Sequence, residues 1–421
     1  MKTVGLIVEY NPLHNGHVYH FEQSKAVTGA DAAIAVMSGH WLQRGEPALV
    51  NKWARAEMAL RMGADVVLEL PVAYSSQAAE WFAYGAVRVL NDCGVVDSLC
   101  FGSESGSIDW LSGLAERLYI EQDDFQQRLA RRLEEGMNYP AAYSAAIRDW
   151  VGEEGGRLNE PNNTLGLHYL IALRRLNSPI IPATIARHKA GYHDRNASDA
   201  HIASATAIRQ WLGSGRQKAG LEKIRSYVPS YTLEILLREL EAGRAPISWG
   251  RYMQPLLNQI VTRSADELRL IHEVSEGLEH RIKRCLAGWR PDKSEASTVG
   301  EAAFEALIEQ MKTKRYTRTK LQRMLVRILL NHRKAQLTRE SLAGGPGYIR
   351  VLGFSAKGRL LLQRMKKKAA CPVLVKIPGE RPPFLEMDIQ AAGAYSLGYS
   401  QPSSAELLRD YYQAPLRIGS E

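Results

Sequence analysis

The chain has 421 residues, of which 45% are hydrophobic and 24% charged, and its formal net charge is +9. This composition is typical of a water-soluble chain of two or three domains, and the positive excess favours a polyanionic partner. No apolar run is long enough to span a bilayer, so we expect no membrane partner. Four scattered cysteines without a CxxC pair, and a first segment that reads as a strand rather than a signal peptide, predict a reduced, cytoplasmic protein.

The first half of the chain alternates strand-like and helix-like segments. Strands are expected at 5–9, 32–37, 65–71, 98–102 and 180–185, with helices at 18–26, 53–62, 78–91 and 165–176. This alternation predicts a Rossmann-like α/β domain with a parallel sheet over residues 1–215, and ligands at the carboxyl ends of its strands. The stretch 107–160 has no clear strand and is expected to be a helical insertion.

The second half has a different character. From about residue 216 to 421 the pattern is mostly helical, with strand-like segments at 348–354 and 373–377 and a basic helix at 359–368. We therefore predict a mostly α-helical, basic region after the first domain. Nothing in the sequence specifies an oligomeric state.

The junction of the first strand and first helix carries the clearest chemical signal. Asn11-Pro12 interrupts the strand, and the sequence HxGH, with His14 and His17, leads into the helix. A helix N-terminus favours an anion, and two imidazoles one turn apart can donate to a transferring phosphoryl group. This order of features predicts a nucleotide-activating enzyme. Zinc binding with His20 and ordinary helix capping are the alternatives, but no cysteine or HExxH motif lies nearby.

A second cluster lies at Ser204, Thr206 and Arg209. Two hydroxyls at a helix start, with an arginine one turn later, can supply donors to phosphate oxygens. Taken alone, the segment fits an ordinary N-cap followed by a surface arginine. The HxGH motif upstream favours the phosphate interpretation.

Together, the two clusters resemble the HIGH-type nucleotidyltransferase superfamily, although Ala203 and Ala205 replace serines that are common in its second motif. A narrower resemblance, to the bacterial tRNA(Met) cytidine acetate ligase family, covers nearly the full chain. Its motifs are VEYNP at 8–12 and the HxGH sequence to His17, MSG at 37–39, QRGEP at 43–47, KWAR at 52–55, FGSE at 101–104, PNN at 161–163 and KAGYH at 189–193.

This resemblance implies the reaction. In that family, acetate and ATP give acetyl-adenylate, and the acetyl group passes to N4 of the wobble cytidine of elongator tRNA(Met), forming N4-acetylcytidine. Mg²⁺ is expected to accompany ATP, with the phosphates as its main ligands, because no acidic cluster suggests a protein-held metal.

The resemblance also implies site residues. Catalytic roles fall on His14, His17, Arg44, Thr206 and Arg209. ATP contacts fall on Gly5, Leu6, Ile7, Val8, Glu9, Tyr10, Asn11, Pro12, Leu13, His14, Asn15, Gly16, His17, Val18, Gly102, Asn162, Asn163, Arg187, His188 and Ser204. A plain turn or cap role is the alternative for Gly102, the two asparagines, Arg187 and His188. Around Arg44, one positive group among Arg44, Lys52 and Arg55 is expected to hold acetate or pyrophosphate, unless Arg44 simply pairs with Glu46.

Basic residues cluster in two segments of the second half. On a helix through 312–334, apolar residues occupy one face and basic residues another, and a second basic patch follows at 359–368. We expect tRNA backbone contacts from Lys320, Arg323, Arg327, Lys334, Lys366 and Lys367. Such contacts bind phosphate and do not choose the base; a merely solvated face is the alternative.

Two other functions compete with the ligase. A small-molecule adenylyltransferase would explain HxGH but would give the basic second half no use. An RNA-binding factor whose nucleotide site only senses ATP belongs to a different class, and the presence of both histidines argues against it.

Overall fold

One sheet organises the molecule. The computed structural model describes residues 1–120, 122–152, 158, 160–187, 203–213, 217–288 and 300–419. Within these residues the strands are β1 (Thr3–Val8), β2 (Ala32–Ser38), β3 (Val66–Leu70), β4 (Ser98–Ser103), β5 (Ile181–Ala186), β6 (Ile349–Ser355), β7 (Val373–Leu374) and β8 (Leu416–Ile418). Their order is β5-β4-β1-β2-β3-β6-β7, with β8 beside β6. Strands β1 to β5 are mutually parallel, which confirms the predicted parallel sheet.

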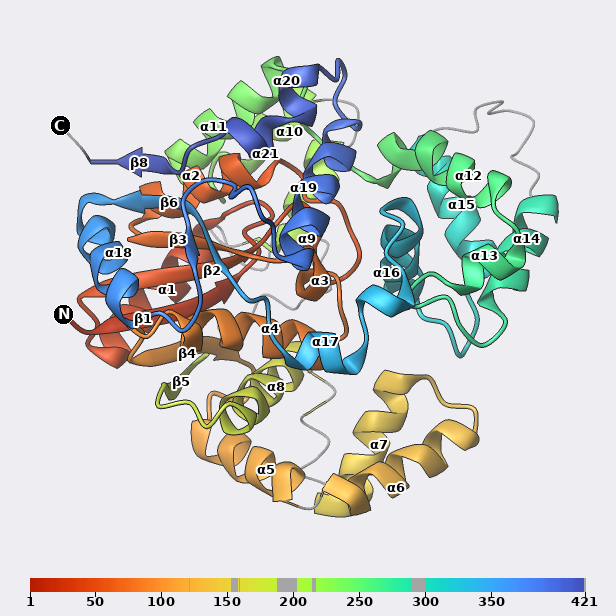
Figure 1. Ribbon diagram of the computed structural model, residues 1–421, viewed down its shortest axis with the longest axis horizontal. Helices are drawn as coiled ribbons and strands as arrows, with labels where there is room; N and C mark the ends of the chain where they lie inside the picture. Colours follow the sequence, from red (N-terminus) through yellow and green to blue (C-terminus); the bar gives the residue numbers. More distant parts are fainter. Residues whose placement is uncertain are drawn as a thin grey trace.

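The sheet is covered on both faces because its strand residues alternate between two cores. In β2, Ile34 and Val36 belong to one apolar cluster, whereas Ala35 and Met37 belong to the other. A strand buried on both faces is typical of a doubly wound α/β fold. One face carries α1 (Asn15–Thr28), α2 (Lys52–Met62), α9 (Ala205–Gly213), α10 (Gln217–Ile224) and α11 (Ser230–Glu241), and the other carries α3 (Val72–Ser75), α4 (Ala79–Asp92) and α8 (Pro161–Arg175) (Figure 1).

Two helical additions lie beside this core. The first, α5 (Ile108–Ile120), α6 (Gln122–Glu134) and α7 (Tyr139–Val151), occupies the stretch predicted to be a helical insertion. The second, η2 (Trp249–Tyr252), α12 (Met253–Thr262), α13 (Ala265–Arg269), α14 (Leu278–Gly288), α15 (Glu301–Met311) and α16 (Arg318–Leu329), forms a helical lobe at the right of Figure 1.

After this lobe the chain returns to the sheet through η3 (Lys334–Gln336), α17 (Arg339–Ala343), β6, α18 (Ala356–Lys368), β7, α19 (Pro383–Ser396), α20 (Ser404–Leu407), α21 (Arg409–Tyr412) and β8. Strand β6 pairs antiparallel with β3, so the last part of the chain extends the sheet of the first domain. The part of the chain after the predicted boundary at residue 215 therefore shares the sheet of the first domain. Local patterning identified the strand at 348–354 but could not show which edge it joins.

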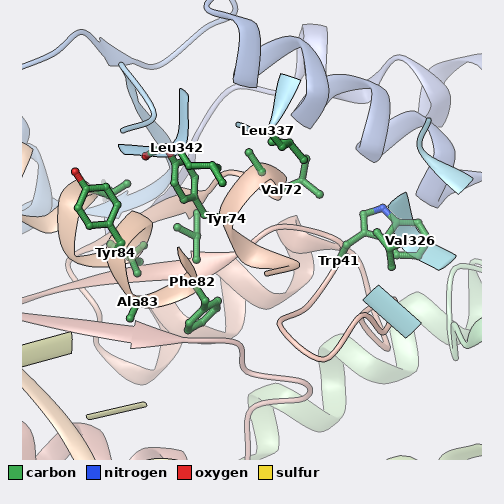
Figure 2. Close-up of a cluster of buried hydrophobic side chains, with 14 of the residues drawn as sticks. Trp41, Val72, Tyr74, Phe82, Ala83, Tyr84, Val326, Leu337 and Leu342 are labelled. Carbon is green, nitrogen blue, oxygen red and sulfur yellow. The ribbon is translucent and has the colours of Figure 1, made fainter. Parts of the chain in front are cut away.

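Buried contacts bind these distant parts of the chain together. Lys52 Nζ lies 2.7 Å from Glu69 and 2.6 Å from Asp410, and Arg350 contacts the same two carboxylates at 3.3 and 2.8 Å. An apolar cluster continues the junction: Figure 2 shows Trp41 beside Val326, and Tyr74 beside Leu342, to whose carbonyl it donates a hydrogen bond. No helix in the described part of the chain is long and apolar enough to cross a membrane.

Candidate active site

The HxGH motif forms the N-terminus of α1, directly beyond the carboxyl end of β1. His14 is the N-cap, with an extended backbone, and its Nδ1 accepts a hydrogen bond from the N–H of Gly16 at 3.1 Å. His17 Nδ1 accepts in turn from the N–H of His14 at 3.2 Å. The two rings contact each other, with 3.8 Å between their centroids and 33° between their planes. The motif is thus a capping box built from two imidazoles.

This capping box fixes the tautomer of both histidines. A backbone N–H only donates, so each Nδ1 must keep its lone pair and each neutral ring must carry its proton on Nε2. Burial, with Arg187 and Arg209 nearby, lowers the pKa of His14 to about 3. Burial and the neighbouring His14 and Arg187 also place the pKa of His17 well below its usual value. Both residues are therefore neutral Nε2–H donors at physiological pH.

The second predicted motif lies against the first. Ser204 Oγ accepts from the N–H of Ala207 and so caps α9. Arg209, one turn into α9, donates to the carbonyl of Asn11 at 3.0 Å and to Thr206 Oγ1 at 3.3 Å. Its guanidinium also lies 3.6 Å from the Glu46 carboxylate. The N-terminal turns of α1 and α9 thus border the same space.

A third group of predicted residues lies at the ends of β4 and β5. Arg187 Nη1 donates to Asn162 Oδ1 at 3.1 Å, and Asn162 Nδ2 donates to Glu104 at 2.5 Å. A Cβ on Gly102 would lie 3.2 Å from Arg187 Cγ, so the glycine leaves room for the arginine beside the site. Asn163 is fully buried and accepts from the N–H of Ser105, which fits the alternative structural role.

One cavity of about 1520 Å³ joins these groups. Of the predicted residues, its lining includes Ile7, Val8, Glu9, Tyr10, Asn11, His14, Gly16, His17, Arg44, Gly102, Asn162, Arg187, Ser204, Thr206, Arg209, Lys320 and Arg323. Gly5, Leu6, Pro12, Leu13, Asn15, Val18 and Asn163 do not line it. Leu6 and Leu13 belong instead to the buried core, and His188 lies outside the described residues.

The charged residues between positions 44 and 55 have two different roles. Arg44 lines the cavity. Glu46 forms its ion pair with Arg209 and not, as the alternative interpretation had it, with Arg44. Lys52 and Arg55 are fully buried; Lys52 belongs to the charge cluster described above, and Arg55 donates to the carbonyls of Glu9 and Ser38. Neither side chain is placed to hold acetate or pyrophosphate.

Glu9 puts a carboxyl group into the same cavity. Its Oε1 accepts from the N–H of Gln43 at 2.8 Å and from Ser38 Oγ at 3.1 Å. Burial raises the pKa of Glu9, although these hydrogen bonds and Arg55 act in the opposite direction. The site thus combines several fixed donors with a carboxyl group that the backbone N–H of Gln43 and the hydroxyl of Ser38 hold in place.

The predicted RNA-binding residues fall into four environments. Lys320 and Arg323 line the cavity from α16, and both contact Glu273, at 3.3 and 3.1 Å. Although burial alone would raise it, these two cations lower the pKa of Glu273 to about 2. Lys334 is exposed just beyond α16, in η3 rather than on the predicted continuous helix.

The position of Arg327 contradicts its predicted role in RNA binding. Its side chain is fully buried and donates to the carbonyls of Val72 and Ala73, which lie in α3, and of Ser76, the C-cap of that helix. The helical pattern correctly placed Arg327 on a face separate from Leu321 and Leu325. At Arg327, however, that face packs against α3 instead of facing solvent, so Arg327 does not contact RNA in this fold.

Lys366 and Lys367 are exposed at the end of α18, far from the cavity. Two hydrogen bonds fix that helix at the amino ends of the strands: Arg364 donates to the carbonyl of Met1, and Lys357 to that of Asp31. The cavity lies at the opposite, carboxyl end of the sheet. Figure 1 accordingly shows α18 and α16 on opposite sides of the molecule.

Sequence reasoning missed other lining residues, among them Trp81, Tyr139, Glu273 and Arg339. They come from four separate segments and carry no local motif, so only the fold reveals that they share a cavity. Among the residues that the structure describes, no group of three or more histidine, cysteine, aspartate or glutamate side chains could hold a metal ion.

Comparison with known proteins assigns the class first. A family described as HIGH nucleotidyltransferase matches residues 1–410. The chain belongs to this family, in agreement with its parallel sheet and the HxGH motif at the N-terminus of α1.

Full-length relatives narrow the assignment. A tRNA(Met) cytidine acetate ligase of Acetivibrio thermocellus is 39% identical over 98% of this chain and 99% of its own length. A ligase of the same name from Bacillus velezensis is 41% identical over 100% and 98%. The structure of Thermotoga maritima TmcAL without ligand superimposes with a TM-score of 0.90 at 35% identity, over the full length of both chains. Another structure, with α-thio ATP bound, gives 0.87. Within the HIGH family, the chain is a member of the tRNA(Met) cytidine acetate ligase group.

Proposed function

We propose that the protein is an ATP-dependent ligase that acetylates N4 of the wobble cytidine in elongator tRNA(Met), with acetate as the acetyl source. The observation that carries this proposal is the pair of tautomer-fixed Nε2–H donors, His14 and His17, at a helix N-terminus inside the cavity. The names of the full-length relatives supply the substrates.

The first step would form acetyl-adenylate. A carboxylate oxygen of acetate attacks the α-phosphorus of ATP, the bond from the α-phosphorus to the bridging oxygen breaks, and pyrophosphate leaves. Negative charge accumulates on the phosphoryl oxygens, where His14 and His17 can donate hydrogen bonds through Nε2 and where the helix dipoles of α1 and α9 favour an anion. Arg209 and Arg187 would add positive charge, and Arg44 is proposed to hold acetate or pyrophosphate.

In the second step the N4 amine of cytidine attacks the acetyl carbonyl. The C–O bond to AMP breaks, AMP leaves, and the nitrogen loses a proton to give the amide. No covalent bond to the protein is needed in either step. The site would then act by positioning and by fixed electrostatics.

Several contacts to the nucleotide are part of this proposal. The loop from Ile7 to His17 would surround ATP, and Gly102, Asn162 and Ser204 border the same space. Mg²⁺ would arrive with ATP and neutralise its β- and γ-phosphates, and its ligands would be phosphate oxygens and water. A cytoplasmic location follows from the proposed substrates, ATP and tRNA.

The cavity favours a macromolecular acceptor over a small one. Its volume of about 1520 Å³ exceeds the range of about 300–1000 Å³ that is usual for a small-molecule site. Lys320 and Arg323 stand at its border, and Lys334 is exposed nearby, as expected for contacts to tRNA phosphates. Lys366 and Lys367 are proposed to reach a more distant part of the tRNA.

Two assays test the proposal. Exchange of labelled pyrophosphate into ATP measures carboxylate activation without tRNA, and mass spectrometry of nucleosides measures acetylation of tRNA. We expect exchange that requires acetate, and transfer of one acetyl group to a single cytidine of tRNA(Met). Adenylylation of a small phosphate ester would support the adenylyltransferase instead. Tight tRNA binding without any turnover would support the ATP-sensing factor.

A further inference from the structure

The cavity extends well beyond the nucleotide-binding wall. HxGH, Arg209 and Arg187 border it at the strand ends, but a second part is lined by α4, α7 and α8. We call this part the aromatic arm, and its defining side chains are Trp81, Tyr139, Tyr143 and His168. None of these residues belongs to a motif that the proposed activation of acetate uses.

The rings of the aromatic arm are held by packing. Tyr139 stacks on Tyr143 with 6.0 Å between centroids and 28° between planes. Tyr143 in turn packs on His168 at 5.5 Å, and Trp81 contacts Tyr84 edge-on at 5.6 Å. Tyr139 is nevertheless 48% exposed and Trp81 only half-buried. Firmly supported aromatic rings that still expose a face provide a surface on which a planar ring can stack.

Polar groups lie beside these rings. Glu80, next to Trp81, lines the cavity and forms an ion pair with Arg175 at 2.7 Å. Burial lowers the pKa of His168 to about 4, so its imidazole is neutral and keeps one donor and one acceptor. A carboxylate and a neutral imidazole can form hydrogen bonds with the edge of a nucleobase, which distinguishes this arm from a purely apolar pocket.

A basic border leads into the arm. It consists of Arg315, Lys320, Arg323 and Arg339, which line the cavity from α16, the segment before it and α17. The two parts meet where Asn138 Nδ2, at the start of α7, donates to the carbonyl of Lys314 at 3.3 Å. Cations at an entrance followed by aromatic rings inside form the combination that binds single-stranded nucleic acid: phosphates outside and an unstacked base within.

We propose that the aromatic arm receives the acceptor nucleobase of the RNA, unstacked from its neighbours, while the basic border binds the adjoining phosphates. This inference rests on the proposed function, because it locates the second substrate of that reaction. It assigns the strand-end wall to acetyl-adenylate and the arm to cytidine, so that N4 enters from the side of α4 and α7. The adenine of ATP is the competing occupant of the arm.

The test compares activation with transfer. We would prepare Trp81→Ala and Tyr139→Ala, with Trp81→Phe and Tyr139→Phe as variants that retain an aromatic ring. Tyr119→Ala is the matched control, because Tyr119 is 47% exposed in the same helical insertion and does not line the cavity. For each variant we would measure acetate-dependent pyrophosphate exchange, the KM for ATP, and acetylation of tRNA(Met).

The expected result is a fall of about 10-fold or more in the ratio of acetylation to exchange for both alanine variants, in the range of one lost stacking contact. The phenylalanine variants should recover most of this ratio. A second measurement removes the base instead of the ring: an anticodon stem-loop that is abasic at the wobble position should bind wild type more weakly. Tyr139→Ala should bind this abasic loop almost as well as wild type does, because the base and the ring that are removed interact with each other.

Three results would overturn the inference. An unchanged ratio in both alanine variants would show that the base does not use the arm. A raised KM for ATP with an unchanged ratio would assign the arm to adenine. Additive losses for the abasic loop and Tyr139→Ala would place the base elsewhere. Wild-type protein that performs no acetate-dependent exchange would instead contradict the proposed function itself, which keeps the two failures distinct.

Discussion

Arg209 donates a hydrogen bond to the backbone carbonyl of Asn11 at 3.0 Å, across 198 positions of sequence. This contact joins the second motif to the loop that carries the first. It holds a guanidinium near His14, and because His14 and His17 are both neutral, neither can stabilise phosphate through a positive charge. The positive charge at this end of the cavity therefore depends on arginines, and the histidines contribute directed N–H groups.

Replacing Arg209 should thus reduce activation of acetate far more than folding. We expect Arg209→Lys to lower acetate-dependent pyrophosphate exchange by about 100-fold, the scale for loss of one donor to a transition-state oxyanion. A lysine keeps the charge but cannot contact Asn11 and phosphate together. Arg225→Ala, which removes an exposed ion pair with Glu222, is the control. Equal rates for Arg209→Lys and wild type would remove Arg209 from the catalytic groups.

The histidine pair predicts an unusual pH dependence. An imidazole with a pKa near 6.5 would titrate in the physiological range, but that of His14 is lowered to about 3. We therefore expect that neither histidine causes an inflection near pH 6.5 in the pH profile of the exchange rate. Any inflection in that range should persist in His14→Asn and His17→Asn. An inflection that disappears in either variant would mean that a histidine works in its charged form.

The lowered pKa of His14 should also make the free energy of unfolding decrease at acidic pH. The unfolded chain binds a proton on His14 below about pH 6.5, whereas the folded chain does not until about pH 3. Unfolding is therefore favoured progressively as pH falls from about 6.5 towards 3. His14→Asn retains an N-cap acceptor without titrating, so its unfolding free energy should fall less steeply over this range. Denaturant titrations at pH 7 and pH 5 give the unfolding free energy of both proteins. An equal loss of unfolding free energy between these pH values in wild type and His14→Asn would contradict the assignment.

Replacing Arg327 should lower the stability of the protein without weakening its binding to tRNA. Arg327→Met leaves three buried carbonyls without their donor, so we expect a loss of about 2–4 kcal/mol in the free energy of unfolding. Its affinity for tRNA, measured on the folded protein at low temperature, should not change. A stable variant with weakened tRNA binding would restore the original sequence interpretation of Arg327.

Lys320→Ala and Arg323→Gln should have the opposite profile. Each should weaken tRNA binding and lower the dependence of log Kd on log salt concentration by about one for each lost phosphate contact. Lys366→Ala tests the distant patch on α18 in the same titration. If only Lys366→Ala changed the salt dependence, tRNA would bind at the amino ends of the strands, away from the cavity.

The sequence predicted what local order determines. The strand at 32–37, the HxGH helix and the cap at Ser204 are set by neighbouring residues, and the structure places them where the pattern indicated. The sequence could not predict what depends on long-range packing. Arg327 looked solvent-facing because its helix is amphipathic, and only the position of α3 shows that it is buried. Trp81 and Arg339 carry no signal at all, because the cavity they line is assembled from segments far apart in the chain.

The antiparallel pairing of β6 with β3 constrains how the molecule can be made. While the ribosome is still translating the segment before residue 349, β3 has an open edge, and Lys52 and Glu69 lack Arg350 and Asp410. An unpaired strand edge can pair with another chain, and the charge cluster beside it is still incomplete. Both features favour aggregation of the nascent chain. A fragment ending at residue 215 should therefore be poorly soluble, although it contains both motifs that border the cavity. The sheet beside these motifs is complete only once β6 has been synthesised and has paired with β3.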